Sequence, residues 1–225
     1  MQTKQAATSE GGVRVFIVDD HPLVRKSLRS LFASQPEFIL CGEAESGEEA
    51  LCKIPESAPH VVVVDLGLCG SSGFVLLRRL RSEHPQIRSL VFSMREEAKY
   101  AMRAIKEGAH GYLMKTVRPE VVLGAILTIS QGKMVVGEEI QQRLLQEASG
   151  AASGARSPDR VLSSREWQVF ECLGKRMTMR EIAVQLQVSE KTVDSFCSRI
   201  KTKLEKVRLR DVAQMAQDWT CDDAL

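Results

Sequence analysis

The sequence predicts an α/β domain built on a doubly wound, five-stranded parallel sheet, followed by a small all-α domain. In residues 13–135, short β-branched apolar runs alternate with longer amphipathic stretches, as in a parallel sheet whose two faces are covered by helices. In residues 161–221, the apolar positions recur at helical spacing instead. The fold class therefore changes between these two regions.

Each of the five apolar runs in the first region precedes a helical pattern. The expected strands are Val13–Val18, Phe38–Ala44, Val61–Leu66, Ile87–Ser93 and Gly111–Met114. The expected helices are Pro22–Ser34, Gly47–Ile54, Gly73–Glu83, Ala98–Glu107 and Pro119–Gln131. Sheets of this kind bind their ligands at the carboxyl ends of the strands. Polar residues at those ends are therefore the first candidates for function.

Capping residues mark the starts of helices in the second region. Ser163 and Glu166 have the spacing of a capping box, Thr178 and Glu181 repeat it, and Ser189 follows a brief turn. The helices expected after that turn span residues 190–204 and 210–219. Two capped helices joined by a tight turn, the second with one apolar and one polar face, predict a helix-turn-helix.

A segment between the two regions has the composition of an exposed linker. Residues 146–160, QEASGAASGARSPDR, are rich in Gly, Ala and Ser and lack hydrophobic periodicity. We therefore expect residues 136–160 to hold the end of a helix and a flexible linker. The net charge is only +2, but residues 160–210 contain 12 basic and six acidic side chains, so the positive charge is concentrated beyond the linker.

The composition excludes several classes of protein. Residues 1–12 lack the apolar core of a secretory signal, and the apolar stretch at 121–129 is shorter than the about 20 residues of a membrane span. The six cysteines form no C-x-x-C pair, which is typical of a reducing compartment. We expect a cytoplasmic protein without a membrane partner.

Charged and hydroxyl side chains follow four of the expected strands. Asp19 and Asp20 end the first strand, Asp65 ends the third, Ser93 ends the fourth and Lys115 follows the fifth. Neighbouring carboxylates raise one another's pKa unless a cation neutralises them, and hard oxygen ligands of this kind suit Mg²⁺. The sequence predicts a magnesium site at this edge of the sheet.

These residues carry a resemblance to a known family. Through VFIVDDHPLVR, VVVVDLGLCGSSG, LVFSM and GYLMKT, residues 13–135 resemble the flavodoxin-like receiver domain of bacterial two-component response regulators. The resemblance implies that Asp65 accepts a phosphoryl group from a cognate histidine kinase. It also implies that Asp20, Asp65 and the backbone carbonyl of Gly67 hold Mg²⁺, with Asp19 assisting.

The same resemblance assigns a switch. It implies that Ser93 and Lys115 contact the phosphoryl group and that Ser93 and Tyr112 rearrange when it is present. The chain departs from the family's pattern at Cys69, where many members have proline four residues after the acceptor. Gly67, Gly70 and Gly73 lie around Cys69, so a looser loop and weaker or slower phosphorylation are expected.

The second region resembles the LuxR-type DNA-binding domain of the NarL/FixJ class of response regulators. The matching stretches are LSSREWQVFECL, REIAVQLQVSEKTV and RIKTKL. The resemblance implies a groove-facing set of Lys191, Asp194, Ser195, Ser198 and Arg199, with Thr192, Lys201 and Lys203 at DNA phosphates. Arg176 replaces a usual glycine and Phe196 a common histidine. In the family the last helix carries the dimer contact; packing of Trp219 on its own domain is the alternative.

Taken together, the two resemblances predict a transcription regulator and not an enzyme. Its expected partners are operator DNA, a cognate histidine kinase, RNA polymerase and, when active, a second copy of the chain. A receiver that works without phosphorylation is one alternative. A phosphohydrolase is another, although haloacid-dehalogenase-type phosphatases need two acids two residues apart and the DD pair at Asp19 and Asp20 does not provide them.

Overall fold

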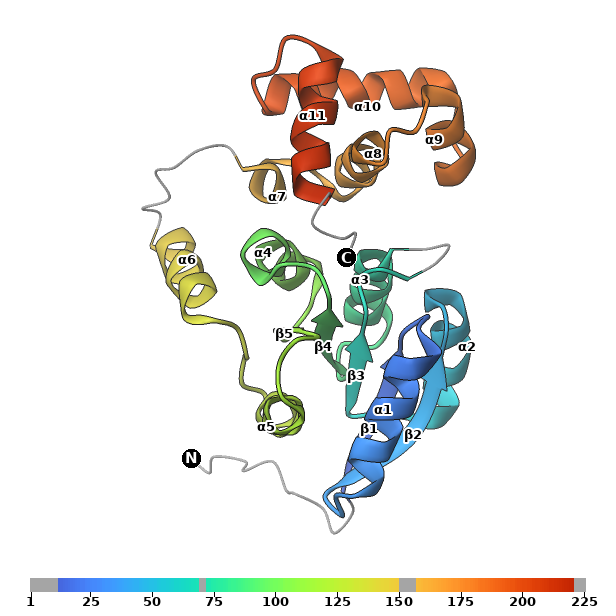
Figure 1. Ribbon diagram of the computed structural model, residues 1–225, viewed down its shortest axis with the longest axis vertical. Helices are drawn as coiled ribbons and strands as arrows, with labels where there is room; N and C mark the ends of the chain where they lie inside the picture. The colour runs from blue at the N-terminus through green and yellow to red at the C-terminus, as the bar shows by residue number, and fades with distance from the viewer. Residues whose placement is uncertain (1–11, 69–71, 150–156, 221–225) are drawn as a thin grey trace. The chain divides into compact units, whose positions relative to one another are not determined.

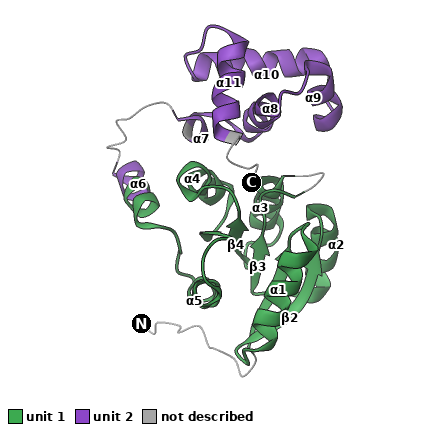
Figure 2. Cartoon of the chain, viewed as in Figure 1, with its two compact units in different colours: residues 1–143 green, residues 144–225 purple. Residues whose placement is uncertain are grey.

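The computed structural model describes residues 12–68, 72–149 and 157–220. The chain divides into two compact units, residues 1–143 and residues 144–225 (Figure 2). The first unit contains the sheet and the second consists of helices. The predicted change of fold class along the chain is therefore confirmed.

The first unit is built on a five-stranded parallel sheet. Its strands are β1 (Val13–Val18), β2 (Phe38–Ala44), β3 (Val61–Val64), β4 (Arg88–Ser93) and β5 (Gly111–Met114). Their order is β2-β1-β3-β4-β5, and every neighbouring pair is parallel. The four valines of β3 are 0–2% exposed, because this central strand is covered on both faces. This order brings the carboxyl ends of β1 and β3 side by side.

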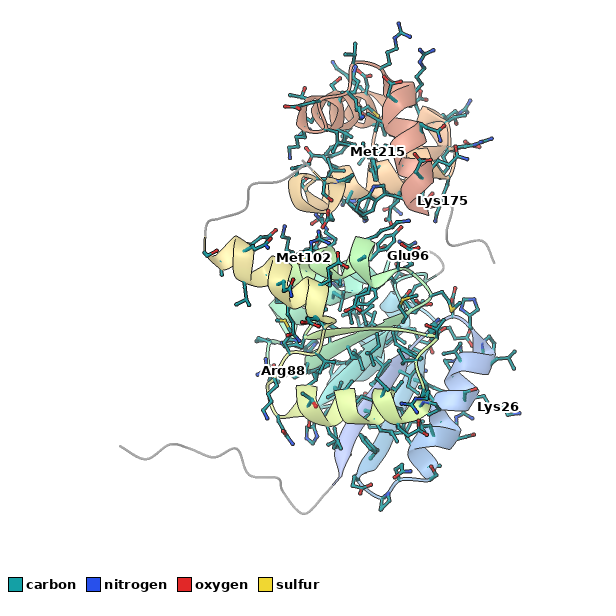
Figure 3. All side chains as sticks on the ribbon, turned by 60° about the vertical axis from the view of Figure 1, so that its left-hand side comes forward. Lys26, Arg88, Glu96, Met102, Lys175 and Met215 are labelled. Atoms are coloured by element: carbon teal, nitrogen blue, oxygen red, sulfur yellow. The ribbon has the colours of Figure 1, made fainter. Side chains whose placement is uncertain are left out.

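Helices cover both faces of the sheet (Figure 1). Helices α1 (Pro22–Ala33) and α5 (Pro119–Ser130) pack on one face, and α2 (Gly47–Ser57), α3 (Gly73–Glu83) and α4 (Glu97–Glu107) lie on the other. Leu28 and Phe32 of α1 and Ile126 of α5 enter the core with the strand valines. Lys26, by contrast, points from α1 into solvent (Figure 3). Helix α2 continues past Pro55 instead of ending before it as expected.

The region after α5 differs from the expectation of a helix end and a flexible linker over 136–160. Residues Glu138–Ala148 form helix α6. Before it, the backbone N–H of Tyr112 donates to the Val135 carbonyl at 2.9 Å, so residue 135 extends the β5 edge of the sheet. The backbone N–H of Gly137 donates to Glu97 at 2.5 Å. Of the expected linker, residues 150–156 lie outside the described part of the chain.

Beyond the end of α6, the described residues of the second unit form a short helix, α7 (Pro158–Val161), and four longer ones. These are α8 (Ser164–Gly174), α9 (Met179–Leu186), α10 (Glu190–Lys203) and α11 (Leu209–Thr220). Both predicted capping boxes are confirmed, as is the cap at Ser189. Trp219 packs edge-on against Trp167 with ring centroids 5.8 Å apart, so it contacts its own unit.

Three described non-glycine residues of this unit, Arg176, Gln187 and Glu205, have a positive φ. Arg176, in the α8–α9 connection, has a φ of +59°. A side chain with a Cβ is disfavoured there and glycine is not, which explains why a glycine is usual at this position in the family the sequence resembles. The turn lies between two helices that are both capped and that both pack against α10.

Candidate functional site

Asp65 lies at the centre of the polar cluster at the carboxyl edge of the sheet. It follows β3 directly, and its backbone N–H pairs with the Val18 carbonyl of β1 at 2.9 Å. The Ser93 hydroxyl donates to Asp65 Oδ1 at 2.7 Å, and Lys115 Nζ contacts Oδ2 at 2.7 Å. The residue is 4% exposed. The ends of β3, β4 and β5 thus place three predicted residues in direct contact.

The two acids that follow β1 belong to the same cluster. Asp19 Oδ2 lies 2.8 Å from Lys115 Nζ, and Asp19 Oδ1 accepts from the backbone N–H of His21 at 2.9 Å. The His21 ring is 2.8 Å from Asp20 Oδ1. Ligand atoms of Asp19, Asp20, His21 and Asp65 all lie within 4.8 Å of one another. Several carboxylate oxygens converging on one point suit a hard divalent cation such as Mg²⁺.

Lys115 is the cation at the centre of these acids. Its side chain is 7% exposed. Burial alone would lower the pKa of its ammonium, but the charge of Asp65 and hydrogen bonds with Asp19 and Asp65 outweigh that effect and raise the pKa. Lys115 therefore stays charged and offsets the repulsion between two buried carboxylates.

Ser93 and Tyr112 connect this cluster to the start of α4. Tyr112 is fully buried, and its hydroxyl donates to the Arg95 carbonyl at 2.9 Å, two residues beyond Ser93. The backbone N–H of Lys115 donates to the Ser93 carbonyl at 2.8 Å. The Arg95 backbone N–H also donates to the Ser93 hydroxyl oxygen at 3.5 Å, so Arg95 of the β4–α4 loop contacts both Ser93 and Tyr112.

The loop after Asp65 is described only in part. Gly67 donates its backbone N–H to Asp65 Oδ1 at 3.2 Å, while Cys69, at which weaker phosphorylation was expected, lies outside the described residues. A Cβ on Gly73 would come within 2.2 Å of the Asp65 carbonyl oxygen, so α3 can begin this close to the strand end only with glycine. The sequence interpretation treated Gly73 as a source of looseness and did not identify this close approach.

The candidate nucleic-acid surface lies on α10. Its predicted groove-facing residues, Lys191, Asp194, Ser195, Ser198 and Arg199, are all exposed. Arg199 stacks over the Phe196 ring, with 4.9 Å between the guanidinium carbon and the ring centroid. Phe196 is half-buried and supports this exposed cation, whereas the core side of α10 is formed by Val193, Cys197 and Ile200.

The three predicted phosphate contacts are less exposed. Thr192, Lys201 and Lys203 are half-buried. The Ser189 and Thr192 hydroxyls lie 2.8 Å apart at the start of α10. Lys203 Nζ is 2.7 Å from Glu166 Oε2, the capping glutamate of α8. This ion pair ties Lys203 to the body of the unit, a role that its spacing along α10 did not reveal.

Comparison with known families divides the chain as the two sites do. Residues 15–127 match the response regulator receiver domain, and residues 160–216 match the luxR family of bacterial regulatory proteins. No helix among the described residues combines the length and apolar character that crossing a membrane requires.

Curated relatives span both parts. The chain is 35% identical over 191 residues to the transcriptional activator protein ExaE of Pseudomonas putida, covering 85% of this chain and 89% of that protein. It is 31% identical over 206 residues to the DNA-binding transcriptional activator DevR/DosR of Mycobacterium tuberculosis, covering 92% and 94%.

A solved structure with the same fold is that of RcsB from Salmonella enterica serovar Typhimurium bound to promoter rprA in the presence of phosphomimetic BeF3-. It has a TM-score of 0.67 at 23% identity, covering 90% of this chain and 98% of that one. The two family matches, in this order along one chain, and the full-length relatives agree. The chain belongs to the response regulators of the NarL/FixJ class, which join a receiver domain to a LuxR-type DNA-binding domain.

Proposed function

We propose that this response regulator controls operator DNA binding through the phosphorylation of Asp65. The observation that carries the proposal is the set of contacts on that carboxylate. Ser93 and Lys115 approach its two oxygens at 2.7 Å each, so a hydroxyl and an ammonium already stand where phosphoryl oxygens would need donors. The functional domains are residues 13–135 and 161–221, with residues 136–160 joining them.

The phosphoryl group comes from a phosphohistidine on a cognate histidine kinase. The phosphorus–nitrogen bond breaks as a carboxylate oxygen of Asp65 bonds to phosphorus, and the departing imidazole takes up a proton from solvent to leave as neutral histidine. Asp20, Asp65 and the Gly67 carbonyl hold Mg²⁺, with Asp19 assisting. When bound, Mg²⁺ neutralises charge on the transferring group and the surrounding acids. Lys115 and Ser93 then bind the phosphoryl oxygens.

Phosphorylation of Asp65 changes the conformation of the β4–α4 loop. When Ser93 turns toward a phosphoryl oxygen, the loop that holds the Arg95 carbonyl on Tyr112 adjusts with it. Such a local charge event can bias a surface between two states. In the active state we expect a homodimer that places α10 in the major groove of operator DNA and recruits RNA polymerase, in the cytoplasm.

On α10, the exposed residues read DNA. Lys191, Ser195, Ser198 and Arg199 present donors to base edges, and Asp194 accepts from a cytosine amino group or repels wrong registers. Thr192 and Lys201 contact phosphates. Lys203 was assigned to the same set, but we propose that its main role is the ion pair with Glu166.

The test is DNA binding to fragments of the source genome, with and without Mg²⁺ plus beryllofluoride, which mimics an aspartyl phosphate. We expect beryllofluoride to tighten specific binding in the parent and in a Glu83→Ala control, whose exposed carboxylate pairs with Arg79 away from the cluster. It should not do so in Asp65→Ala.

Other outcomes distinguish the alternatives. Specific DNA binding that is the same with and without beryllofluoride would mean that the receiver is regulated without phosphorylation. Turnover of a generic phosphate ester that depends on Asp65 or Asp19 would favour a phosphohydrolase instead.

A further inference from the structure

Arg25 is a buried charge that the proposed reaction does not use. It lies on the first turns of α1, and its side chain is 9% exposed. Burying a guanidinium is costly unless it is paired and hydrogen-bonded, so its partners indicate why it is there.

One partner, Asp19, belongs to the acidic cluster, and the other, Glu45, lies outside it. Arg25 Nη1 donates to the backbone carbonyl of Asp19 at 2.7 Å, and Nη2 pairs with Glu45, just after β2. One guanidinium thus joins α1, the β1–α1 loop and the β2–α2 loop. Its rigid fork suits two simultaneous acceptors in a way that a lysine ammonium does not.

The carbonyl that Arg25 contacts belongs to the peptide plane between Asp19 and Asp20. The N–H of Asp19 is held by the Ala44 carbonyl at 3.1 Å, and its carboxylate is held by Lys115 and the His21 N–H. Because a peptide unit is planar, fixing the Asp19 carbonyl also fixes the direction in which the chain enters Asp20. Arg25 therefore restrains the one acid of the cluster that follows this peptide.

We infer that Arg25 is a positioning residue for the metal site: by holding the Asp19–Asp20 peptide, it keeps the Asp20 carboxylate converged with Asp65 and so raises the affinity for Mg²⁺. The inference rests on the proposed function for its use of the metal. The positive charge of Arg25 has the opposite effect on the affinity for Mg²⁺, because a nearby cation disfavours the binding of a second one. The two effects predict opposite results when the side chain is removed.

The experiment measures Mn²⁺ binding to the full-length protein by electron paramagnetic resonance of the free ion, with no phosphoryl donor present. We compare the parent with Arg25→Met, Arg25→Lys and Glu45→Gln. Losing a residue that orients metal ligands is expected to weaken Mn²⁺ binding by about tenfold in Arg25→Met. Arg25→Lys keeps the charge and can satisfy one acceptor, so it should recover part of the affinity. Glu45→Gln leaves the contact with the Asp19 carbonyl and should stay within about twofold of the parent, because second-shell losses of affinity follow the lost orienting contact.

A second readout separates positioning from general damage to the fold. If Arg25 acts only on metal affinity, saturating Mg²⁺ should restore beryllofluoride binding by Arg25→Met to the parent level. Unchanged or tighter Mn²⁺ binding in Arg25→Met would overturn the inference. Should that variant unfold, Arg25→Lys decides: parental melting with weakened binding supports positioning, and parental binding overturns it.

The proposed function fails separately from this inference. A parent that binds Mn²⁺ but cannot be phosphorylated would contradict the role of Asp65 and leave the role of Arg25 measurable. A parent that binds no Mn²⁺ would overturn the metal site and this inference together.

Discussion

The acidic edge of the sheet and the exposed face of α10 differ in how their polar side chains are held. At the sheet edge, Asp65 is 4% exposed and is contacted by Ser93 and Lys115 through 2.7 Å contacts from other strand ends. On α10, Ser195 and Arg199 make their hydrogen bonds with carbonyls of their own helix, at 2.9 and 3.3 Å. A buried polar group must find partners within the fold, whereas an exposed one is satisfied by water until its ligand arrives.

This difference predicts that the sheet edge is sensitive to the loss of one partner. Lys115→Met would leave Asp19 and Asp65 buried beside each other without their shared cation. We expect the free energy of unfolding, measured by urea denaturation without divalent ions, to fall by about 3–5 kcal/mol. Added Mg²⁺ should stabilise the variant more than the parent, because the metal would supply the missing positive charge.

Lys26→Met is the matched control for that change. Lys26 lies exposed on α1 (Figure 3), so its loss should alter the unfolding free energy by less than about 0.5 kcal/mol. If Lys115→Met were equally mild in the absence of metal, the acidic edge would not depend on this ammonium and the contrast with α10 would fail.

On α10 the same type of change should affect binding and leave the fold intact. Arg199→Ala removes an exposed guanidinium stacked on Phe196. We expect it to weaken operator binding by about 1–3 kcal/mol and to relax sequence preference, with little change in melting temperature. Binding isotherms on operator and scrambled DNA at two salt concentrations would measure both effects. If this variant bound DNA with the affinity and specificity of the parent, Arg199 would not be among the residues that contact bases.

The sequence predicts the sheet edge in more detail than the α10 face, because the first is buried and the second is exposed. The strand ends could be found because a buried valine run must stop at the sheet edge, so Asp65 after β3 and Asp19 after β1 had to meet. For α10 the sequence predicts which residues lie on the exposed face, but not which DNA atoms each of them contacts, because no contact within the chain fixes these side chains.

What the sequence did not reveal depends on contacts between distant residues. Helix α6 was not predicted: it buries Ile140, and Arg143 donates to the Ala98 carbonyl of α4, a residue far away in the sequence. The buried Arg25 was read only as part of a motif, since its acceptors are a backbone carbonyl and a residue of another loop. Composition alone favoured a flexible linker over residues 146–160, but the first three of these residues belong to α6.

A smaller effect is expected at the strained turn of the helical unit. Arg176→Gly would relieve the φ of +59° and should raise the free energy of unfolding by about 1 kcal/mol. Arg180→Gly, in the first turn of α9, is the matched control and should lower it by less than about 1 kcal/mol, the cost of glycine in a helix interior. Thermal unfolding of both variants measures the difference. A destabilised Arg176→Gly would mean that the arginine side chain makes a contact outweighing its backbone strain.

The smallest effect is expected at the ion pair between Glu166 and Lys203 of α10, where, as at the sheet edge, a lysine pairs with a buried carboxylate. Glu166 is 2% exposed and pairs with Lys203, whose side chain is 39% exposed. Burial alone would raise the pKa of Glu166, but the hydrogen bonds from Lys203 and from the Ser163 backbone outweigh it and hold the pKa below its ordinary value near 4.5. A carboxyl with a lowered pKa stabilises the fold above about pH 4.5, and that contribution is lost as the pH falls through the folded value.

Lys203→Ala should therefore reduce stability by less than about 1 kcal/mol at neutral pH, since solvent screens the pair, and the difference from the parent should shrink on acidification below about pH 4.5. Urea denaturation at several pH values measures this convergence. Operator binding should be unchanged if the ammonium belongs to Glu166, in contrast to Arg199→Ala on the same helix. Weakened binding with a lower salt dependence would instead return Lys203 to the set of residues that contact phosphates.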